Sequence, residues 1–161
     1  MPPRRPREGE AMPNAIELLE ADHEKVKKLL ERGDDTTERA VKTRTELFAE
    51  IKKEMEVHEA IEEEIFYPAL KEHPKAKDIV LEGYEEHHVV DQIIAELAET
   101  SVEDERWTAK FAVMKENVEH HIEEEEDDMF AKARDVFTKE ELEALGERME
   151  ARKKELEARA G

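Results

Sequence analysis

Residues 48–65, FAEIKKEMEVHEAIEEEI, hold the pattern that decides the fold. Positions three and four apart share one face of an α-helix, because the helix repeats every 3.6 residues. One such face carries apolar side chains interrupted by a histidine and a glutamate: Phe48, Ile51, Met55, His58, Glu62 and Ile65. A buried carboxylate is costly without a partner, and this face has no lysine or arginine to neutralise it. A metal ion is the simplest remaining partner.

Residues 111–129, FAVMKENVEHHIEEEEDDM, repeat this pattern. Their apolar face carries the same two polar intrusions in the same order: Phe111, Met114, Val118, His121, Glu125 and Met129. The repetition predicts two equivalent amphipathic helices, each of which turns a histidine and a glutamate toward one core.

The duplication extends to the segments upstream of these two helices. DHEKVKKLL, at residues 22–30, aligns with EEHHVVDQII, at residues 85–94, and places one histidine of each segment among aliphatic residues. His23 precedes His58 by 35 residues, and His87 precedes His121 by 34. Two helix pairs of one pattern predict an all-α fold, an up-and-down four-helix bundle with a di-metal site in its core and a C-terminal fifth helix.

Composition narrows the class of protein. The chain has 161 residues, of which 44% are charged and 5% aromatic, and its formal net charge is -19. This charge argues against binding to nucleic acid or to an anionic membrane, because both require clustered lysine and arginine. No apolar run approaches the roughly 20 residues of a membrane span. With no cysteine to form a disulfide or a thiolate ligand, we expect a cytoplasmic protein whose metal is held by nitrogen and oxygen.

The chain divides into three predicted parts. Residues 1–13 have the composition of a disordered tail, residues 14–134 form the bundle, and residues 135–161 form an amphipathic helix that packs on the bundle or on a partner subunit. The expected oligomeric state is a monomer or a weak homodimer.

Capping residues, glycine and proline predict the ends of the first two helices. Asn14 with Glu17 opens a helix over about residues 15–32, which Gly33 is expected to close in a left-handed conformation. Asp35 with Glu38 is expected to cap the second helix. That helix should bend near Pro68 and stop before His73 and Pro74, because the residue before a proline resists helical geometry.

The same signals predict three further helices. The third covers about residues 76–99, and the fourth runs from a cap formed by Ser101 and Asp104 to about residue 134. Thr138 with Glu141 caps the fifth helix, which carries a narrow apolar seam of Leu142, Leu145, Met149 and Leu156.

Six polar side chains would meet in the core of this bundle. They are the candidate metal ligands: His23, His58, Glu62, His87, His121 and Glu125. If both glutamates bridge two ions, each ion receives two imidazole nitrogens and two carboxylate oxygens, and about two octahedral positions stay open. This donor set suits iron best, tolerates manganese and is less typical of zinc, and the sequence alone leaves the metal open.

This constellation resembles the hemerythrin-like family, also called HHE cation-binding domains. The quoted motifs occur in the family's order, and the FYPAL that follows the first His-x-x-x-Glu is itself typical of the family. The resemblance covers residues 14–134. It implies two oxygen-bridged iron ions, held by the six named residues, that meet dioxygen, peroxide or nitric oxide in a redox, stress-protection or sensing role.

The resemblance also has departures that bear on function. Oxygen-carrying hemerythrins have a fifth histidine four residues from that of the third helix, where this chain has Gly83 and Asp91. Their second carboxylate is an aspartate five residues after the histidine, whereas Glu125 follows His121 by four. Reversible oxygen carriage is therefore the weaker alternative, and a peroxide- or nitric-oxide-directed oxidoreductase activity stays open.

Two other functions are compatible with the sequence. Ferritin-like iron oxidation or storage uses Glu-x-x-His pairs, which Glu20 with His23 and Glu85 with His88 would supply. This reading leaves the two His-x-x-x-Glu pairs without a role. A purely structural bundle for protein contacts would leave six buried polar groups unexplained.

The remaining histidines and tyrosines are assigned to other surroundings. His88 and His120 fall off the apolar faces and are expected at the surface or as hydrogen-bond partners of the ligands. Tyr67 and Tyr84 are expected in the core or at its boundary. The alternative for Tyr84 is an approach to the metals, since it lies three residues before His87.

Overall fold

The computed structural model describes residues 13–160, so most of the predicted tail over residues 1–13 lies outside the described residues. The first helix, α1 (Ala15–Asp34), begins with the predicted capping box. The Glu17 amide donates to Asn14 Oδ1 at 2.9 Å, and the Asn14 amide donates to Glu17 Oε1 at 3.2 Å.

The predicted left-handed end at Gly33 is wrong, because α1 continues through this residue to Asp34. Gly33 is buried, and a Cβ atom added there would meet the ring of Phe111. The absence of a side chain at this glycine therefore lets α1 lie close to a phenylalanine of α5 (Glu105–Glu124), and the glycine does not form a turn of the backbone.

The predicted cap at Asp35 and Glu38 is also wrong. The second helix, α2 (Val41–Ile61), starts after Ala40 without a side-chain cap. The connecting loop is held instead by the buried Arg44, whose Nε donates to Thr36 Oγ1 at 2.9 Å and whose Nη1 donates to the Val102 carbonyl at 2.8 Å. A capping pattern is local, so it could not predict that a loop would be ordered by an arginine further along the chain.

Helix α2 continues without a break through a π-helical turn, η1 (Glu62–Phe66), into α3 (Tyr67–Lys71), so the three form one continuous helical segment. We predicted a bend near Pro68, and the structure has a π turn directly before α3, which contains this proline. This helical segment ends before His73 and Pro74, as predicted. A 3₁₀ turn, η2 (Pro74–Ala76), then leads into α4 (Lys77–Ala98).

The second half of the bundle repeats this construction. Asp104 caps α5 and accepts a hydrogen bond from the Arg106 amide at 2.8 Å. Of the two residues predicted to form this cap, Ser101 and Asp104, it is therefore Asp104 that caps the helix. A second π turn, η3 (Glu125–Met129), follows α5 and leads into α6 (Phe130–Val136). Each π turn thus begins at a glutamate of a His-x-x-x-Glu motif.

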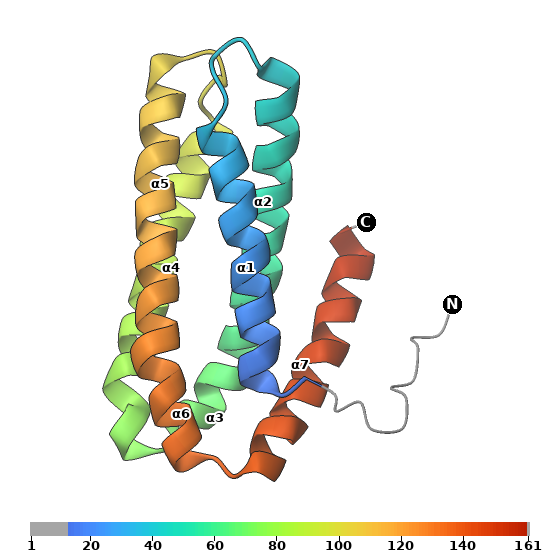
Figure 1. Ribbon diagram of the computed structural model, residues 1–161, viewed down its shortest axis with the longest axis vertical. Helices are drawn as coiled ribbons and strands as arrows, with labels where there is room; N and C mark the ends of the chain where they lie inside the picture. The colour runs from blue at the N-terminus through green and yellow to red at the C-terminus, as the bar shows by residue number, and fades with distance from the viewer. Residues whose placement is uncertain (1–12, 161) are drawn as a thin grey trace.

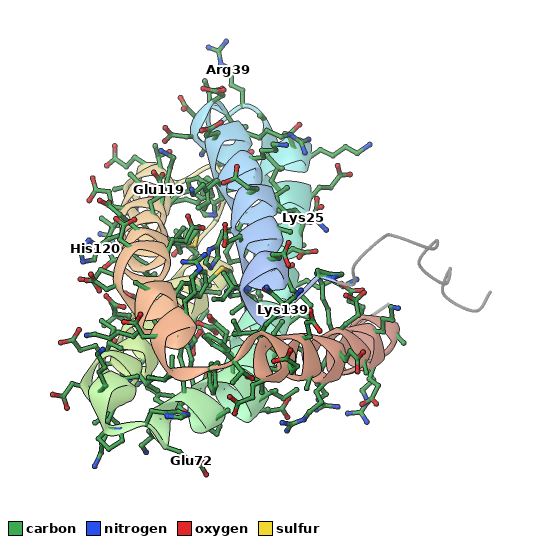
Figure 2. The ribbon with its side chains drawn as sticks, turned by 60° about the horizontal axis from the view of Figure 1, so that its bottom comes forward. Lys25, Arg39, Glu72, Glu119, His120 and Lys139 are labelled. Atoms are coloured by element: carbon green, nitrogen blue, oxygen red, sulfur yellow. The ribbon has the colours of Figure 1, made fainter. Side chains whose placement is uncertain are left out.

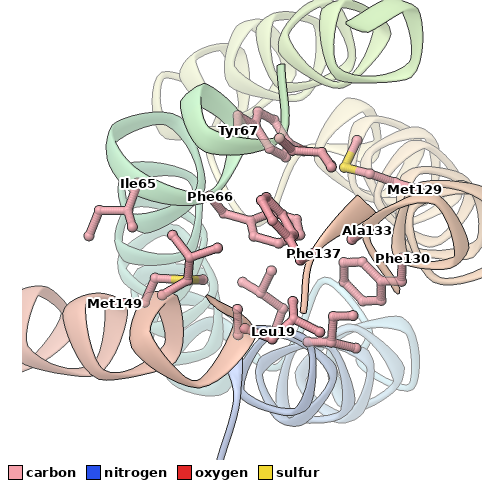
Figure 3. Packing of buried hydrophobic residues seen from close by; sticks show 14 of the residues in the cluster. Leu19, Ile65, Phe66, Tyr67, Met129, Phe130, Ala133, Phe137 and Met149 are labelled. Atoms are coloured by element: carbon pink, nitrogen blue, oxygen red, sulfur yellow. The ribbon is translucent and has the colours of Figure 1, made fainter. Parts of the chain in front are cut away.

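The fifth helix, α7 (Lys139–Ala160), begins with the predicted capping box of Thr138 and Glu141. Its seam packs on the bundle of the same chain, where Leu142, Leu145 and Met149 are buried. Figure 3 shows Met149 of α7 beside Leu19 of α1 and Phe66 of η1.

Four helices, α1, α2, α4 and α5, run alongside one another, and α7 leaves the lower end obliquely beside α1 (Figure 1). The predicted all-α fold, an up-and-down bundle followed by a fifth helix, is confirmed, and residues 13–160 contain no strand. None of the described helices has the length and the apolar run that crossing a lipid bilayer requires.

Two apolar clusters fill the bundle, one toward each end. Along α1, Leu19 belongs to the cluster that includes α3, α6 and α7, whereas Val26 belongs to the opposite one. His23 lies between these two positions in the sequence, and His121 lies likewise between Val118 and Met129. The fold therefore places a polar layer between two apolar clusters.

Candidate metal centre

The polar layer consists of the six predicted side chains. All are buried, with no more than 4% of any residue exposed, and they come from α1, α2, η1, α4, α5 and η3: His23, His58, Glu62, His87, His121 and Glu125. They form two four-residue groups whose potential ligand atoms lie within 4.8 Å of one another. One group contains His23 and His58, the other contains His87 and His121, and Glu62 and Glu125 belong to both.

The two shared carboxylates lie among the inward nitrogens of the four imidazoles. Glu125 Oε1 is 3.0 Å from His23 Nε2, and Glu125 Oε2 is 3.1 Å from His121 Nε2. Glu62 Oε1 is 3.1 Å from His87 Nε2 and 3.2 Å from His58 Nε2. The arrangement is pseudo-symmetric, since each glutamate faces one histidine from either half of the chain.

Each of the four histidines of the centre contacts a second carboxylate through its outer ring nitrogen, Nδ1. The Nδ1 of His23 is 2.7 Å from Glu126, that of His58 is 3.1 Å from Asp22, that of His87 is 3.2 Å from Glu63 and that of His121 is 2.8 Å from Glu86. A carboxylate only accepts, so Nδ1 carries the proton in each pair. With the ring proton held on Nδ1, loss of the other proton would leave the Nε2 lone pair for a metal, which is the usual construction of a histidine ligand.

Three atoms in this layer are buried without a hydrogen-bond partner: His58 Nε2, His121 Nε2 and Glu62 Oε2. The two nitrogens lie near carboxylates but are not aligned with them, whereas buried polar atoms in folded proteins almost always have a partner. A cation shared by nitrogen and oxygen donors would supply that partner. The side chains therefore fit a metal centre.

Without a cation, protons must balance the carboxylates. Burial opposes the charge of His58, but the Coulombic field of Glu62, the hydrogen bond with Asp22 and the nearby carboxylate of Glu125 outweigh it and hold the pKa of His58 well above its ordinary value. The pKa of His121 is raised in the same way, chiefly through Glu125. Burial alone would raise the pKa of Glu125, yet the neighbouring histidines lower it. Metal binding would thus displace protons from the imidazoles.

Tyr67 also belongs to the centre, which the sequence analysis did not predict. Its hydroxyl donates to Glu125 Oε2 at 2.6 Å, and its ring stacks on His87 with centroids 5.3 Å apart. Gly83 makes room for it, because a Cβ atom there would lie 2.9 Å from the Tyr67 hydroxyl. Tyr84 instead packs against the Tyr67 ring in a T-shaped arrangement, at 5.2 Å between centroids.

The π turn explains why Tyr67 was missed. In an α-helix, a residue five positions after Glu62 would point well away from it, but the π turn joins the Tyr67 amide to the Glu62 carbonyl and returns position five to the same face. Phe130 follows Glu125 in the same way and stacks on His23, with centroids 5.9 Å apart. The two halves therefore differ in one atom here, since only Tyr67 carries a hydroxyl.

The histidines expected outside the centre lie outside it. His88 is exposed and lies 3.3 Å from the Gln92 amide, and His120 extends from the outer face of α5 (Figure 2). His120 belongs to an outer group with Glu86 and Glu124, in which Glu86 also contacts His121.

The site and the bundle together define a class of protein with a buried histidine and carboxylate centre between four helices, and comparisons with known proteins agree. Residues 14–133 match the Hemerythrin HHE cation binding domain. The uncharacterised proteins Rv2633c of Mycobacterium tuberculosis (strain ATCC 25618 / H37Rv) and Mb2666c of Mycobacterium bovis (strain ATCC BAA-935 / AF2122/97) are each 34% identical to this chain over 148 residues, or 89% of the chain and 87% of the relative.

A solved structure extends this similarity to three dimensions. The crystal structure of a Hemerythrin HHE cation binding domain-containing protein, the Rv2633c homolog from Mycobacterium kansasii, superposes with a TM-score of 0.80 at 30% sequence identity. The match covers 91% of this chain and 89% of the other. The chain belongs to the hemerythrin HHE cation-binding domain family.

Proposed function

We propose that this chain is a non-haem di-iron protein that binds or reacts with dioxygen, peroxide or nitric oxide, in redox protection or sensing. The observation that carries the proposal is the pair of overlapping four-residue groups that share Glu62 and Glu125. Two such groups fit two ions better than one, because each group brings its own pair of histidines.

The donor chemistry favours iron, with manganese as the second choice. All six candidate ligands are imidazoles or carboxylates, and the chain contains no cysteine. Bound iron would supply electrons and open coordination positions for a small oxygen-containing molecule, whereas the protein supplies position, charge and exclusion of water.

The protein's own groups place a hydrogen-bond donor beside the centre. Burial, together with the charges of Glu125 and Glu62, raises the pKa of Tyr67 well above its ordinary value, so the phenol keeps its proton and donates it in a hydrogen bond to Glu125. The outer carboxylates orient all four imidazoles. The phenol is therefore a fixed hydrogen-bond donor beside the His87 and His121 half, where it would orient a small oxygen-containing ligand, and not a source of protons.

The alternatives have less support in the arrangement of side chains. For ferritin-like chemistry, Glu85 and His88 are both exposed, and Glu20 lies 3.4 Å from Arg134 at the surface. For oxygen carriage, the place of Gly83 is taken up by the Tyr67 hydroxyl, and Asp91 is exposed.

Anaerobic mixing tests this function. Protein loaded with ferrous iron is mixed with dioxygen, with hydrogen peroxide and with nitric oxide, and the absorbance is followed over time. We expect a saturable change with peroxide or nitric oxide that is slower in Tyr67→Phe than in Tyr84→Phe. Protein that holds its iron and responds to none of the three molecules would contradict the proposal, and uptake of many irons per chain would support storage instead.

A further inference from the structure

The four outer carboxylates of the centre are not equivalent. The side chains of Glu126, Glu63 and Glu86 are 29%, 40% and 26% exposed, whereas that of Asp22, the partner of His58, is only 5% exposed. A carboxylate buried to this extent is costly unless a cation compensates it. Asp22 therefore needs a partner that the other three can do without.

That partner comes from the fifth helix. Lys153 of α7 places its Nζ 2.5 Å from Asp22 Oδ1, while Asp22 Oδ2 lies 3.1 Å from His58 Nδ1. Lys153 is itself largely buried, with 25% of its side chain exposed. A continuous series of polar contacts thus runs from α7, through α1, to a candidate ligand on α2.

The position of Lys153 is fixed by the residues around it. Met149, one turn earlier, is fully buried in the apolar cluster. Arg152 forms a bidentate contact with Glu64, at 2.9 Å from Nε and 3.1 Å from Nη2. Glu64 belongs to the π turn that begins at Glu62, a carboxylate shared by both groups, so α7 contacts the surroundings of the centre at two separate points.

The other half is built differently. The outer partners of His87 and His121, Glu63 and Glu86, are partly exposed to solvent. This half carries the Tyr67 hydroxyl, which is 3.4 Å from His87 Nε2, whereas the corresponding ring near His23 belongs to a phenylalanine. The His23 and His58 half therefore contains Asp22, the outer carboxylate that α7 contacts, and the other half contains the hydroxyl of Tyr67 as an internal hydrogen-bond donor. The remaining outer partner of the first half, Glu126, is exposed to about the same extent as Glu86.

From this asymmetry we infer that α7 clamps one of two metal positions: Lys153, acting through Asp22, holds His58 in its ligating orientation. The position formed by His23 and His58 then releases its ion slowly, and the position formed by His87 and His121 releases its ion quickly. This inference rests on the proposed di-iron centre. Lys153 is a positioning residue, since it acts through Asp22 and contacts no candidate ligand directly.

Chelator-driven release of iron from the full-length, di-iron protein tests the clamp. We expect two kinetic phases of similar amplitude in the natural chain. Lys153→Met should speed the slow phase by up to about 10–100-fold, the range by which loss of a group that orients a metal ligand weakens metal binding, and leave the fast phase unchanged. Asp22→Asn, which keeps the side-chain volume, should speed the same phase.

The matched control is Lys154→Met. Lys154 is the neighbouring lysine on α7, half exposed and 3.7 Å from Glu150 of the same helix, so both of its phases should match the natural chain. Lys153→Arg should release the slow-phase iron at nearly the rate of the natural chain, unlike Lys153→Met, because arginine returns a cation to Asp22.

Three results would overturn the clamp. The first is an unchanged slow phase in both Lys153→Met and Asp22→Asn, and the second is an equal acceleration of both phases, which indicates a general loss of stability. The third is a single phase of iron release from a natural chain that carries two irons. A natural chain that binds no iron is a different failure, because it overturns the proposed function itself.

Discussion

Replacing Tyr67 by phenylalanine removes one oxygen atom from the middle of the bundle and makes the two halves of the centre alike at this position, where the other half has Phe130. The lost hydroxyl donates at 2.6 Å to Glu125, and neither residue is more than 1% exposed. A hydrogen bond to a charged group contributes about 1.5–3 kcal/mol. At about 2–4 °C per kcal/mol for a domain of this size, we expect metal-free Tyr67→Phe to melt roughly 3–12 °C below the natural chain.

The assay is thermal and urea denaturation of chelator-treated protein, followed by far-ultraviolet circular dichroism. Tyr84→Phe is the matched control, because Tyr84 is partly exposed and packs against Tyr67, and its loss should stay within about 0.5 kcal/mol. If the two variants lose the same stability, the Tyr67 hydroxyl is not bound to Glu125 and our account of the asymmetric centre fails.

Three further predictions concern the ligands, the pH dependence and the packing. His58→Ala should lose bound metal while His120→Ala retains it, as measured by metal analysis of the purified variants; equal loss in both would refute the assignment of helix faces. In metal-free protein, the protonated imidazoles of His58 and His121 stabilise the fold, because the pKa of each is raised in the folded state. This stabilisation is complete below about pH 6.5 and is lost as the pH rises through the raised pKa values. Metal needs neutral imidazoles, so the rise in melting temperature on adding metal should grow with pH and vanish near pH 4; a rise that is constant with pH would argue against histidine ligation. Gly33→Ala should cost about 1–3 kcal/mol in urea denaturation, because the new methyl group meets the Phe111 ring, and a neutral substitution would contradict this packing.

Most of the bundle and the six candidate ligands could be predicted because both depend on helical periodicity. His58 and Glu62 are four residues apart on an apolar face, and the structure buries both in one layer with His23 and His87. Burial of a charged group on an apolar face is a strong signal, since few arrangements other than a metal site make it stable.

Features that depend on local irregularity or on distant contacts could not be predicted. Tyr67 reaches the centre only because a π turn adds one residue to the helix, and the periodicity of an α-helix places its side chain elsewhere. Lys153 and Asp22 are 131 positions apart, so their contact depends on how α7 docks. Gly33 carries a signal typical of a helix end, but the structure uses its small size for packing against Phe111.

The central claim is that two irons occupy the layer formed by the two overlapping groups. Metal analysis of protein produced with added iron, combined with its near-ultraviolet spectrum, tests this claim most directly. Our account predicts about two irons per chain, one for each group, with charge-transfer bands of an oxygen-bridged pair. A metal-free protein with full stability, unchanged when iron is added, would contradict it.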